Sequence, residues 1–343
     1  MSASLPKKLV SDEARALHHD CLVVDLHCDT LLSQRLYGYD PTKRHSNPLP
    51  LSPLTCQADI PRLQEGGVGA VALGIVVNPL RRRSGPNAIR RALVDMAGWQ
   101  ENAPEAVAVI DTAADIVEAR KAGKIAVFAG LEGAHGLDTR LEDLAEFRSA
   151  GLRYVGLSHF TRNSAATNAF GWGANNRDGL SDFGRELVDE LGNQKILVDL
   201  AHINRPGYME ICKRTNQPVL VTHTGVRGAY DVWRNIDDEQ LRAVADTGGV
   251  VGIIFAPAYL KAGFTCSLRE VVAHIQHVIR VAGEDHVGLG TDVDGFVTLP
   301  PDFPDVSAMP LLTQYMLDAG MTESQIRKCL GANTLRAFEA VCG

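Results

Sequence analysis

Eight short apolar segments recur along the chain, and several of the stretches between them carry apolar residues at helical spacing. The apolar segments span 21–29, 70–77, 124–133, 152–160, 195–202, 218–224, 249–255 and 286–292. The clearest helical patterns lie at 178–192, 237–249 and 267–283, and glycine closes each of them, as it does at many helix ends. Strands that alternate with helices predict right-handed βαβ units and a parallel sheet.

Eight such units favour an α/β fold of the (β/α)8 TIM-barrel type. The 343 residues exceed the roughly 250 of a typical barrel, which leaves room for insertions. We expect an N-terminal helical extension over about 1–20 and long loops at 36–56 and 161–180. A doubly wound open sheet is the alternative, but it calls for a glycine-rich phosphate loop after the first strand, and "DLHCDTLL" has none. No linker or low-complexity stretch interrupts the chain, so we expect one domain over 1–343.

Composition argues against several classes of function. The net charge is −7, and no lysine or arginine block lies beside aromatic residues, which argues against nucleic-acid binding. Seven scattered cysteines, an odd number without a C-x-x-C pair, argue against a disulfide framework and favour a reducing cytoplasm. The N-terminus has no apolar signal-peptide core, and no run of 18 apolar residues exists, so we expect no membrane association.

Ionisable residues gather where the predicted strands end, which is the face on which barrel active sites form. They are His27, Asp29, Glu132, His159, His202, His223 and Asp292. Residues two apart on a strand point to the same side. His27 therefore shares a face with Val23, His202 with Val198 and His223 with Val219, and we expect those faces to line the barrel.

A metal site explains this gathering better than separate structural roles do. One strand-end histidine is commonly a hydrogen-bonded core residue, and one carboxylate there is commonly a helix N-cap. Many together would repel one another or stay unsatisfied, whereas a dication needs neutral imidazoles and ionised carboxylates. Three histidines and two or three carboxylates exceed the ligands of one catalytic zinc and suit two ions about 3.5–4 Å apart. Glu132 is the candidate bridge; Zn²⁺ fits best, with Mn²⁺, Co²⁺ or Fe²⁺ as alternatives.

At these residues the chain resembles the membrane (renal) dipeptidases, within the amidohydrolase-like metal hydrolases. The resemblance runs from about residue 20 to the C-terminus. It rests on "DLHCDTL", "GLEGAHGL", "LVDLAH", "VLVTHTG" and "GLGTDVDG" in this order, and on the helical segment 178–192. Many relatives in the wider superfamily open with H-x-H and use a modified lysine as the bridge. This chain has H-x-D and a glutamate, which favours the dipeptidase branch.

The resemblance implies a ligand set. His27 and Asp29 would hold one zinc ion, His202 and His223 would hold the other, and Glu132 would bridge the two ions.

The resemblance also implies three roles toward the substrate. Asp292 would act as general acid and base. His159, in "GLSHFTRN", would polarise the substrate carbonyl, and Arg234, in "DVWRNID", would clamp the C-terminal carboxylate. An alternative for Arg234 is a surface ion pair with Asp231 or Asp237.

The function expected from these residues is hydrolysis of dipeptides with a free C-terminal carboxylate, L-D dipeptides included, by a dinuclear zinc enzyme. The alternatives are a related amidohydrolase acting on another small amide or lactone, and a non-catalytic metal-dependent binding barrel, against which the retained Asp292 argues. A small dipeptide is the expected partner, and a homodimer is the assembly considered. The loop at 161–180, with Phe170 and Trp172, either walls the substrate pocket or is only a long surface loop.

Overall fold

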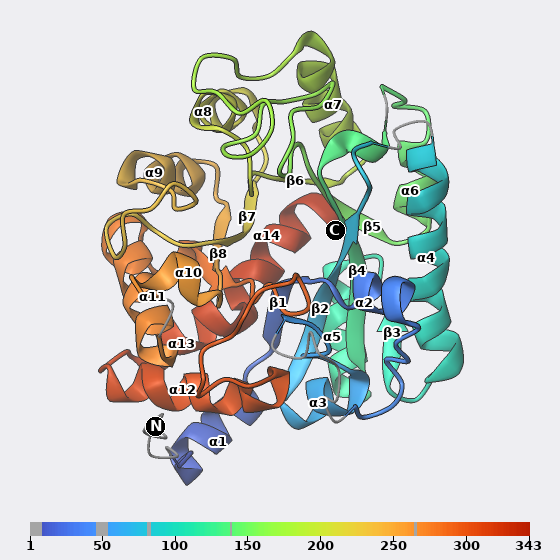
Figure 1. Cartoon of the computed structure of the whole chain (residues 1–343). Coiled ribbons are helices and arrows are strands. Elements are labelled where there is room, and N and C mark those ends of the chain that lie inside the picture. Colours follow the sequence, from blue (N-terminus) through green and yellow to red (C-terminus); the bar gives the residue numbers. More distant parts are fainter. Residues whose placement is uncertain (1–8, 46–53, 81–83, 138, 264–265) are drawn as a thin grey trace.

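Parallel strands form the centre of the molecule. The structure is a computed structural model that describes residues 9–45, 54–80, 84–137, 139–263 and 266–343. Within these ranges the strands are β1 Val23–Cys28, β2 Val68–Val76, β3 Val107–Val109, β4 Ile125–Glu132, β5 Leu152–Gly156, β6 Leu197–Asp199, β7 Leu220–Thr224, β8 Val250–Ile253 and β9 Val287–Leu289. Their order is β2-β1-β9-β8-β7-β6-β5-β4-β3, and an additional β2–β4 pairing closes eight of them into a ring (Figure 1). The predicted (β/α)8 barrel is confirmed.

Strand β3 is the element that the sequence patterns did not indicate. It pairs only with the first residues of β4, from Val107 opposite Ile125 to Val109 opposite Val127, and so lies outside the closed ring. Three residues are too few to show a period in an apolar pattern, which is why this strand was missed.

Helices surround the barrel (Figure 1). They are α1 Asp12–Asp20, α2 Thr30–Tyr37, α3 Ile60–Glu65, α4 Gly85–Asn102, α5 Ala113–Lys121, α6 Leu144–Ser149, α7 Asp182–Asn193, α8 Arg205–Arg214, α9 Asp238–Asp246, α10 Pro257–Leu260, α11 Leu268–Ala282, α12 Met309–Asp318, α13 Glu323–Arg327 and α14 Asn333–Cys342. Thr112, Asp237 and Ser267 begin α5, α9 and α11 with capping boxes. Across the described ranges, no helix is both long enough and apolar enough to cross a membrane.

The three predicted helical patterns at 178–192, 237–249 and 267–283 are confirmed as α7, α9 and α11. Residues 1–8 of the predicted N-terminal extension lie outside the described part of the chain, and the described part contains α1, which lies against α12. The predicted loop at 36–56 overlaps the end of α2, and its residues 46–53 lie outside the described part of the chain.

The two faces of the strands contribute to two apolar clusters, and their assignment corrects the predicted orientation. Val24 and Leu220 belong to a cluster with the inward Phe128 and Tyr154 and with residues of α14, which contacts β1, β6, β8 and β9. Val23, Val198 and Val219 belong instead to the larger cluster that the outer helices cover. The prediction that the faces of Val23, Val198 and Val219 line the barrel is therefore wrong.

Irregular strand pairing explains why the histidines still reach the barrel mouth. The register shifts between Asp25 and Cys28 in β1 and between Val221 and Thr224 in β7. His27 and His223 lie within these two shifts. A bulge changes which side of the sheet the following side chains face, and bulges are frequent beside active sites. In β1 and β7 the alternation at the start of the strand therefore does not extend to the histidine, whereas the register of β4 with β2 runs unbroken to Glu132.

Candidate metal centre

The predicted site residues lie at the carboxyl ends of the strands, as expected. Within the strands are His27 in β1, Glu132 at the last position of β4 and His223 in β7. In the loops that follow are Asp29 after β1, His159 after β5, His202 after β6 and Asp292 after β9. The structure thus brings all seven to one mouth of the barrel, although only three belong to strands.

Two of the loop residues adopt a backbone conformation that is rare outside glycine. The φ angle is 64° at His202 and 62° at Asp292. Residues in this left-handed region persist where the surroundings enforce it, and they concentrate at functional sites. Local backbone geometry, and not strand alternation, therefore aims these two side chains.

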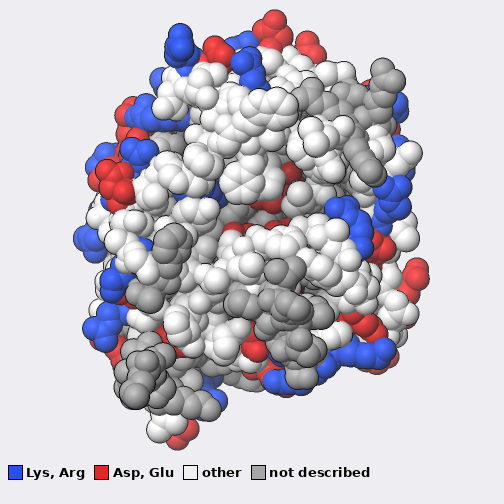
Figure 2. All heavy atoms as spheres, viewed as in Figure 1, with Lys and Arg blue, Asp and Glu red and all other residues white. Residues whose placement is uncertain are grey.

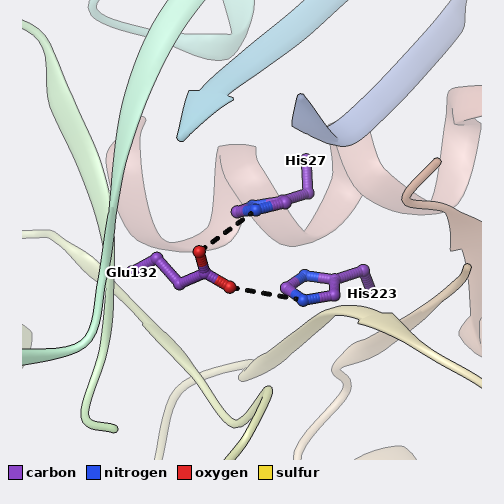
Figure 3. A group of neighbouring side chains, drawn as sticks. All are labelled: His27, Glu132 and His223. Carbon is purple, nitrogen blue, oxygen red and sulfur yellow. Dashed lines mark ion pairs between the residues drawn. The ribbon is translucent and has the colours of Figure 1, made fainter. Parts of the chain in front are cut away.

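The Glu132 carboxylate lies between one imidazole on one side and a group of three on the other. Its Oε1 is 3.0 Å from Nε2 of His202, 3.4 Å from Nε2 of His223 and 3.7 Å from Nε2 of His159. Its Oε2 is 3.7 Å from Nε2 of His27, and Figure 3 shows His27 and His223 facing the two carboxylate oxygens. One carboxylate with its oxygens directed to two sets of ligands is the geometry that a bridge between two cations requires.

Asp29 and Asp292 complete the side of the site around His27. Asp29 Oδ2 is 3.6 Å from Nε2 of His27, and potential ligand atoms of His27, Asp29 and Asp292 all lie within 4.8 Å of one another. A side chain at Gly74 would collide with Asp29, and one at Gly295 would collide with Asp292. Glycine at these two positions lets the carboxylates approach one another.

Unpaired polar atoms show that the residues fit a cation. Nε2 of His27 and Oδ1 of Asp29 are buried, and neither has a hydrogen-bond partner within the described part of the chain. Nε2 of His202 lies only 2.9 Å from Nε2 of His223. Buried polar atoms without partners cost folding free energy, and converging neutral imidazole and carboxylate lone pairs are the donor set that a divalent metal ion binds.

Hydrogen bonds behind the imidazoles fix their orientation. Nδ1 of His27 lies 2.8 Å from the Tyr154 hydroxyl, and Nδ1 of His223 lies 3.0 Å from the Thr222 hydroxyl. Thr222 in turn donates to Oδ2 of Asp199 at 3.0 Å. With a proton on each Nδ1, both Nε2 atoms are free to bind a metal ion. A tyrosine, a threonine and an aspartate inside otherwise apolar strands indicate a polar role for these residues, but the sequence does not show which histidine each one supports.

The electrostatic environment keeps His202, His223 and Glu132 in metal-binding forms. Burial lowers the pKa of His202 and of His223, which favours neutral imidazoles. Burial alone would raise the pKa of Glu132, but the imidazoles of His159 and His27 lower it well below its usual range. Glu132 is therefore the ionised centre of the cluster. His27 differs: burial lowers its pKa, but Tyr154, Glu132 and Asp29 raise it well above its usual range, so a bound metal ion would replace its proton.

Asp292 differs, because burial raises its pKa well above the usual range and the neighbouring Asp29 and Glu132 raise it further. His27 and Arg234 oppose this rise without cancelling it. A carboxyl group with a raised pKa holds and returns a proton more readily than an ordinary carboxylate, as general acid and base catalysis demands.

Arg234 is buried and has no carboxylate partner among the described residues. Its Nη2 donates to the carbonyl oxygen of His223 at 2.7 Å, and its Nη1 donates to the Thr224 hydroxyl at 3.3 Å. The alternative of a surface pair with Asp231 or Asp237 is wrong, since Arg227 contacts Asp231 and Arg205 contacts Asp237.

Two further residues lie beside the site. His159 is at the mouth, where its ring is 4.4 Å from that of Phe160 and 4.7 Å from that of His202. Tyr259, in α10, raises the pKa of Arg234 against the larger, lowering effect of burial. The predicted strand at 249–255 offered no candidate of its own, and nothing in its spacing pointed to a tyrosine in the helix that follows.

A closed parallel barrel with histidines and carboxylates at the carboxyl ends of its strands defines the class of metal-dependent barrel hydrolases. The chain belongs to the membrane dipeptidase family, peptidase family M19, which matches residues 11–342. It is a metal-dependent dipeptidase.

Individual relatives agree with this assignment. An uncharacterised protein in the pqqA 5' region of Klebsiella pneumoniae is 33% identical over 237 residues, which cover 67% of this chain and 87% of that protein. The crystal structure of a family M19 metallopeptidase, dipeptidase AC, is 26% identical with a TM-score of 0.85 and covers 94% of this chain and 99% of its own. A Rhodobacter sphaeroides metallopeptidase bound to a phosphinate mimic of L-Ala-D-Ala is also 26% identical, with a TM-score of 0.82 over 94% of this chain and 100% of its own.

Proposed function

We propose that the protein is a dinuclear zinc dipeptidase that cleaves dipeptides with a free C-terminal carboxylate, L-D dipeptides included. The observation that carries this proposal is the pairing of two features. A buried carboxylate, Glu132, lies between His27 and a second group of imidazoles. A buried guanidinium, Arg234, lies near the same site and has no acidic partner among the described residues. The dipeptide mimic bound to the Rhodobacter sphaeroides relative, an L-D compound, supports the substrate class.

Five residues would hold the metal ions. His27 and Asp29 would bind one, His202 and His223 would bind the other, and Glu132 would bridge them. When bound, the ions supply Lewis acidity at neutral pH. Imidazole and carboxylate ligands without thiolate fit Zn²⁺, as well as Mn²⁺, Co²⁺ and Fe²⁺.

The remaining residues act directly on the substrate. Asp292 takes a proton from the water that attacks the peptide carbonyl and delivers it to the leaving amine as the C–N bond breaks. His159 donates a hydrogen bond to the carbonyl oxygen as negative charge develops there. The cytoplasm and a homodimeric assembly remain predictions from the sequence.

Arg234 would explain why the substrate needs a free C-terminal carboxylate. Two of its nitrogens already donate to the His223 carbonyl and the Thr224 hydroxyl, which fixes the plane of the guanidinium. A planar guanidinium held in this way binds a carboxylate through a pair of charge-assisted hydrogen bonds. The distance from this carboxylate to the metal centre would then restrict cleavage to the peptide bond of the last residue.

The test compares one dipeptide with its C-terminal amide. The wild type should cleave the acid and reject the amide, because a neutral terminus leaves a buried guanidinium unpaired. Arg234→Ala should lower kcat/KM for the acid by an amount equivalent to about 2–5 kcal/mol of activation free energy, the range for losing one partner of a buried charge pair. Arg234→Lys should recover little, since a point charge does not reproduce the planar fork.

Arg227→Ala is the matched control, because Arg227 lies in the same segment and pairs with Asp231. It should leave both rates unchanged. Equal rates for acid and amide on the wild type would remove the carboxylate clamp and favour the related amidohydrolase acting on other small amides.

A further inference from the structure

We propose that Phe170 and Trp233 form an aromatic wall that binds the side chain of the C-terminal residue of the dipeptide, so that the enzyme prefers large apolar or aromatic residues there. This inference rests on the proposed function and adds a substrate class to it. It also decides between the two roles considered for the loop at 161–180.

Several aromatic side chains are unusually exposed at the mouth of the site. Phe170 is 50% exposed and Trp233 is 38% exposed, although burying such a ring fully is worth about 1.5–3 kcal/mol. Figure 2 shows acidic side chains at the bottom of a hollow that is bordered mainly by uncharged residues. Grouped, exposed apolar surface at the rim of a polar pocket commonly marks a ligand-binding surface.

The two rings come from segments far apart in the sequence and pack against each other. Their centroids are 4.0 Å apart with an interplanar angle of 24°, which is a stacked arrangement. The ring of Tyr259 meets Trp233 edge-on, with 5.7 Å between centroids. The wall is therefore continuous across three segments of the chain.

Backbone contacts tie the Phe170 side of the wall to the metal centre. The amide of Ala169 donates to the carbonyl oxygen of His202 at 2.8 Å, and the Asn168 side chain donates to the carbonyl oxygen of Phe170. Asn168 also forms a β-bridge with Ile203. Phe170 is thus held in a fixed position relative to a proposed metal ligand, and a surface held in its binding position loses less conformational entropy when a ligand binds.

The Trp233 side of the wall adjoins the proposed carboxylate clamp. Trp233 directly precedes Arg234 in the chain. The Asn235 side chain donates to the carbonyl oxygens of Tyr230 at 2.7 Å and Tyr259 at 2.8 Å, which fixes this segment against α10. The carboxylate and the side chain of a C-terminal residue branch from one Cα atom. With the carboxylate on Arg234, that side chain lies beside the wall.

The chemistry of the wall selects for apolar groups. Phe170 and Trp233 are neutral, and burial raises the pKa of Tyr259, so it too is neutral at physiological pH. An apolar side chain that packs against these rings leaves water, whereas a carboxylate would lose hydration without gaining a partner.

The experiment measures kcat/KM for a series Ala-X in which X is Ala, Leu, Phe or Asp, each as the L and the D isomer. The wild type should prefer Phe over Ala and Asp by about tenfold or more, in the range that apolar pockets achieve. Phe170→Ala and Trp233→Ala should each remove most of that preference, because each should lower kcat/KM for Ala-Phe much more than for Ala-Ala. Trp233→Phe should restore much of it.

Trp172→Ala is the matched control. Trp172 is on the same loop as Phe170 and is 77% exposed, and it makes none of the ring contacts of the wall. This variant should keep the wild-type preference. Inhibition by the free amino acids supplies a second readout, because phenylalanine should inhibit the wild type more strongly than alanine and lose that advantage in Phe170→Ala.

The outcomes separate this inference from the proposed function. A wild type that cleaves Ala-Phe and Ala-Asp equally well overturns the wall and leaves the dipeptidase intact. The same holds if the variants slow all substrates equally, or if selectivity appears for Phe-Ala and not for Ala-Phe. A wild type that cleaves no dipeptide overturns the proposed function and the wall together.

Discussion

Two polar clusters in this molecule are similarly buried, but the polar atoms of one have hydrogen-bond partners and several of those in the other do not. One is the metal centre around Glu132 at the carboxyl ends of the strands. The other surrounds Arg62 in α3, where Arg62 is 3% exposed and Asp59 is fully buried. The comparison shows how buried charge that stabilises the fold differs from buried charge that is available to a ligand.

In the Arg62 cluster the protein supplies the partners itself. Nε of Arg62 donates to Asp59 Oδ2 at 2.8 Å, and Nη2 donates to the Tyr39 hydroxyl at 2.9 Å and to the carbonyl oxygen of Cys56 at 2.8 Å. Nη1 reaches Asp305 at 3.3 Å. A charged group whose hydrogen-bonding atoms are already paired within the protein gains little by binding a ligand.

In the metal centre the protein leaves charges and lone pairs directed at one another. Nε2 of His27 and Oδ1 of Asp29 have no hydrogen-bond partner among the described residues, and the rings of His27 and His223 stack with centroids only 4.2 Å apart. A cation would resolve each of these contacts at once. Three experiments test this contrast.

The largest expected effect is on catalysis. Asp292→Asn should lower kcat by about 10²–10⁴-fold, because an amide cannot take up and deliver the proton. The substitution preserves the shape of the side chain, so elemental analysis should find about two metal ions per chain in the wild type and in the variant. Loss of metal together with activity would instead make Asp292 a ligand, a role that its closeness to His27 and Asp29 also permits.

The second effect is on stability, and it should depend on metal in one cluster only. Arg62→Met should lower the free energy of unfolding by about 3–5 kcal/mol, because it leaves Asp59 as an unpaired buried charge. Urea unfolding should report the same loss with and without a chelator.

Asp29→Asn provides the contrasting case. In chelated protein it should lower the urea midpoint less than Arg62→Met does, since Oδ1 of Asp29 has no hydrogen-bond partner among the described residues and Oδ2 has only the 3.6 Å contact with His27. In metal-loaded protein it should remove the stabilisation that bound metal provides. A large loss in chelated protein would mean that Asp29 stabilises the fold as Asp59 does.

The contrast also explains what the sequence could and could not predict. The eight barrel strands were predictable, because apolar runs and helical periodicity can be read from the local sequence without knowledge of tertiary contacts. The ligands His27, Glu132 and His223 were predictable because ionisable residues at strand ends are costly without a function. The face on which these ligands lie was not predictable, since register shifts in β1 and β7 depend on pairing with neighbouring strands.

Partners brought together by tertiary contact were also beyond the sequence. Tyr154 lies 127 positions from His27, and Phe170 lies far from Trp233, yet each pair is in contact. No local pattern encodes such pairs. The left-handed conformations of His202 and Asp292 are likewise set by the loops around them.

The smallest of the three effects concerns His274 in α11, a buried side chain whose partners accept it in one protonation state only. The amide of Val226 donates to its Nδ1 at 3.0 Å, so its Nε2 carries the proton and donates to the carbonyl oxygen of Leu260 at 3.2 Å. Protonating Nδ1 would place its N–H directly against the amide N–H of Val226, so neither could act as an acceptor. The pKa of His274 is lowered to about 4, mainly by burial; the hydrogen bond to Leu260 and the charge of Glu270 oppose this shift, and His277 adds to it.

Because the folded-state pKa lies below the unfolded value of about 6.5, the unfolded chain binds more protons between these two values. The stability that His274 contributes is therefore complete above about pH 6.5 and declines as the pH falls toward 4, by about 3 kcal/mol in all. Urea midpoints from pH 7 to pH 4.5, measured in chelator so that metal release does not contribute, should fall more steeply for the wild type than for His274→Gln. His18, whose pKa burial also lowers, contributes equally to both proteins and cancels in the difference. Parallel curves would mean that His274 accepts a second proton at no cost, and that its neighbours rearrange in a way that the closely paired Arg62 cluster does not allow.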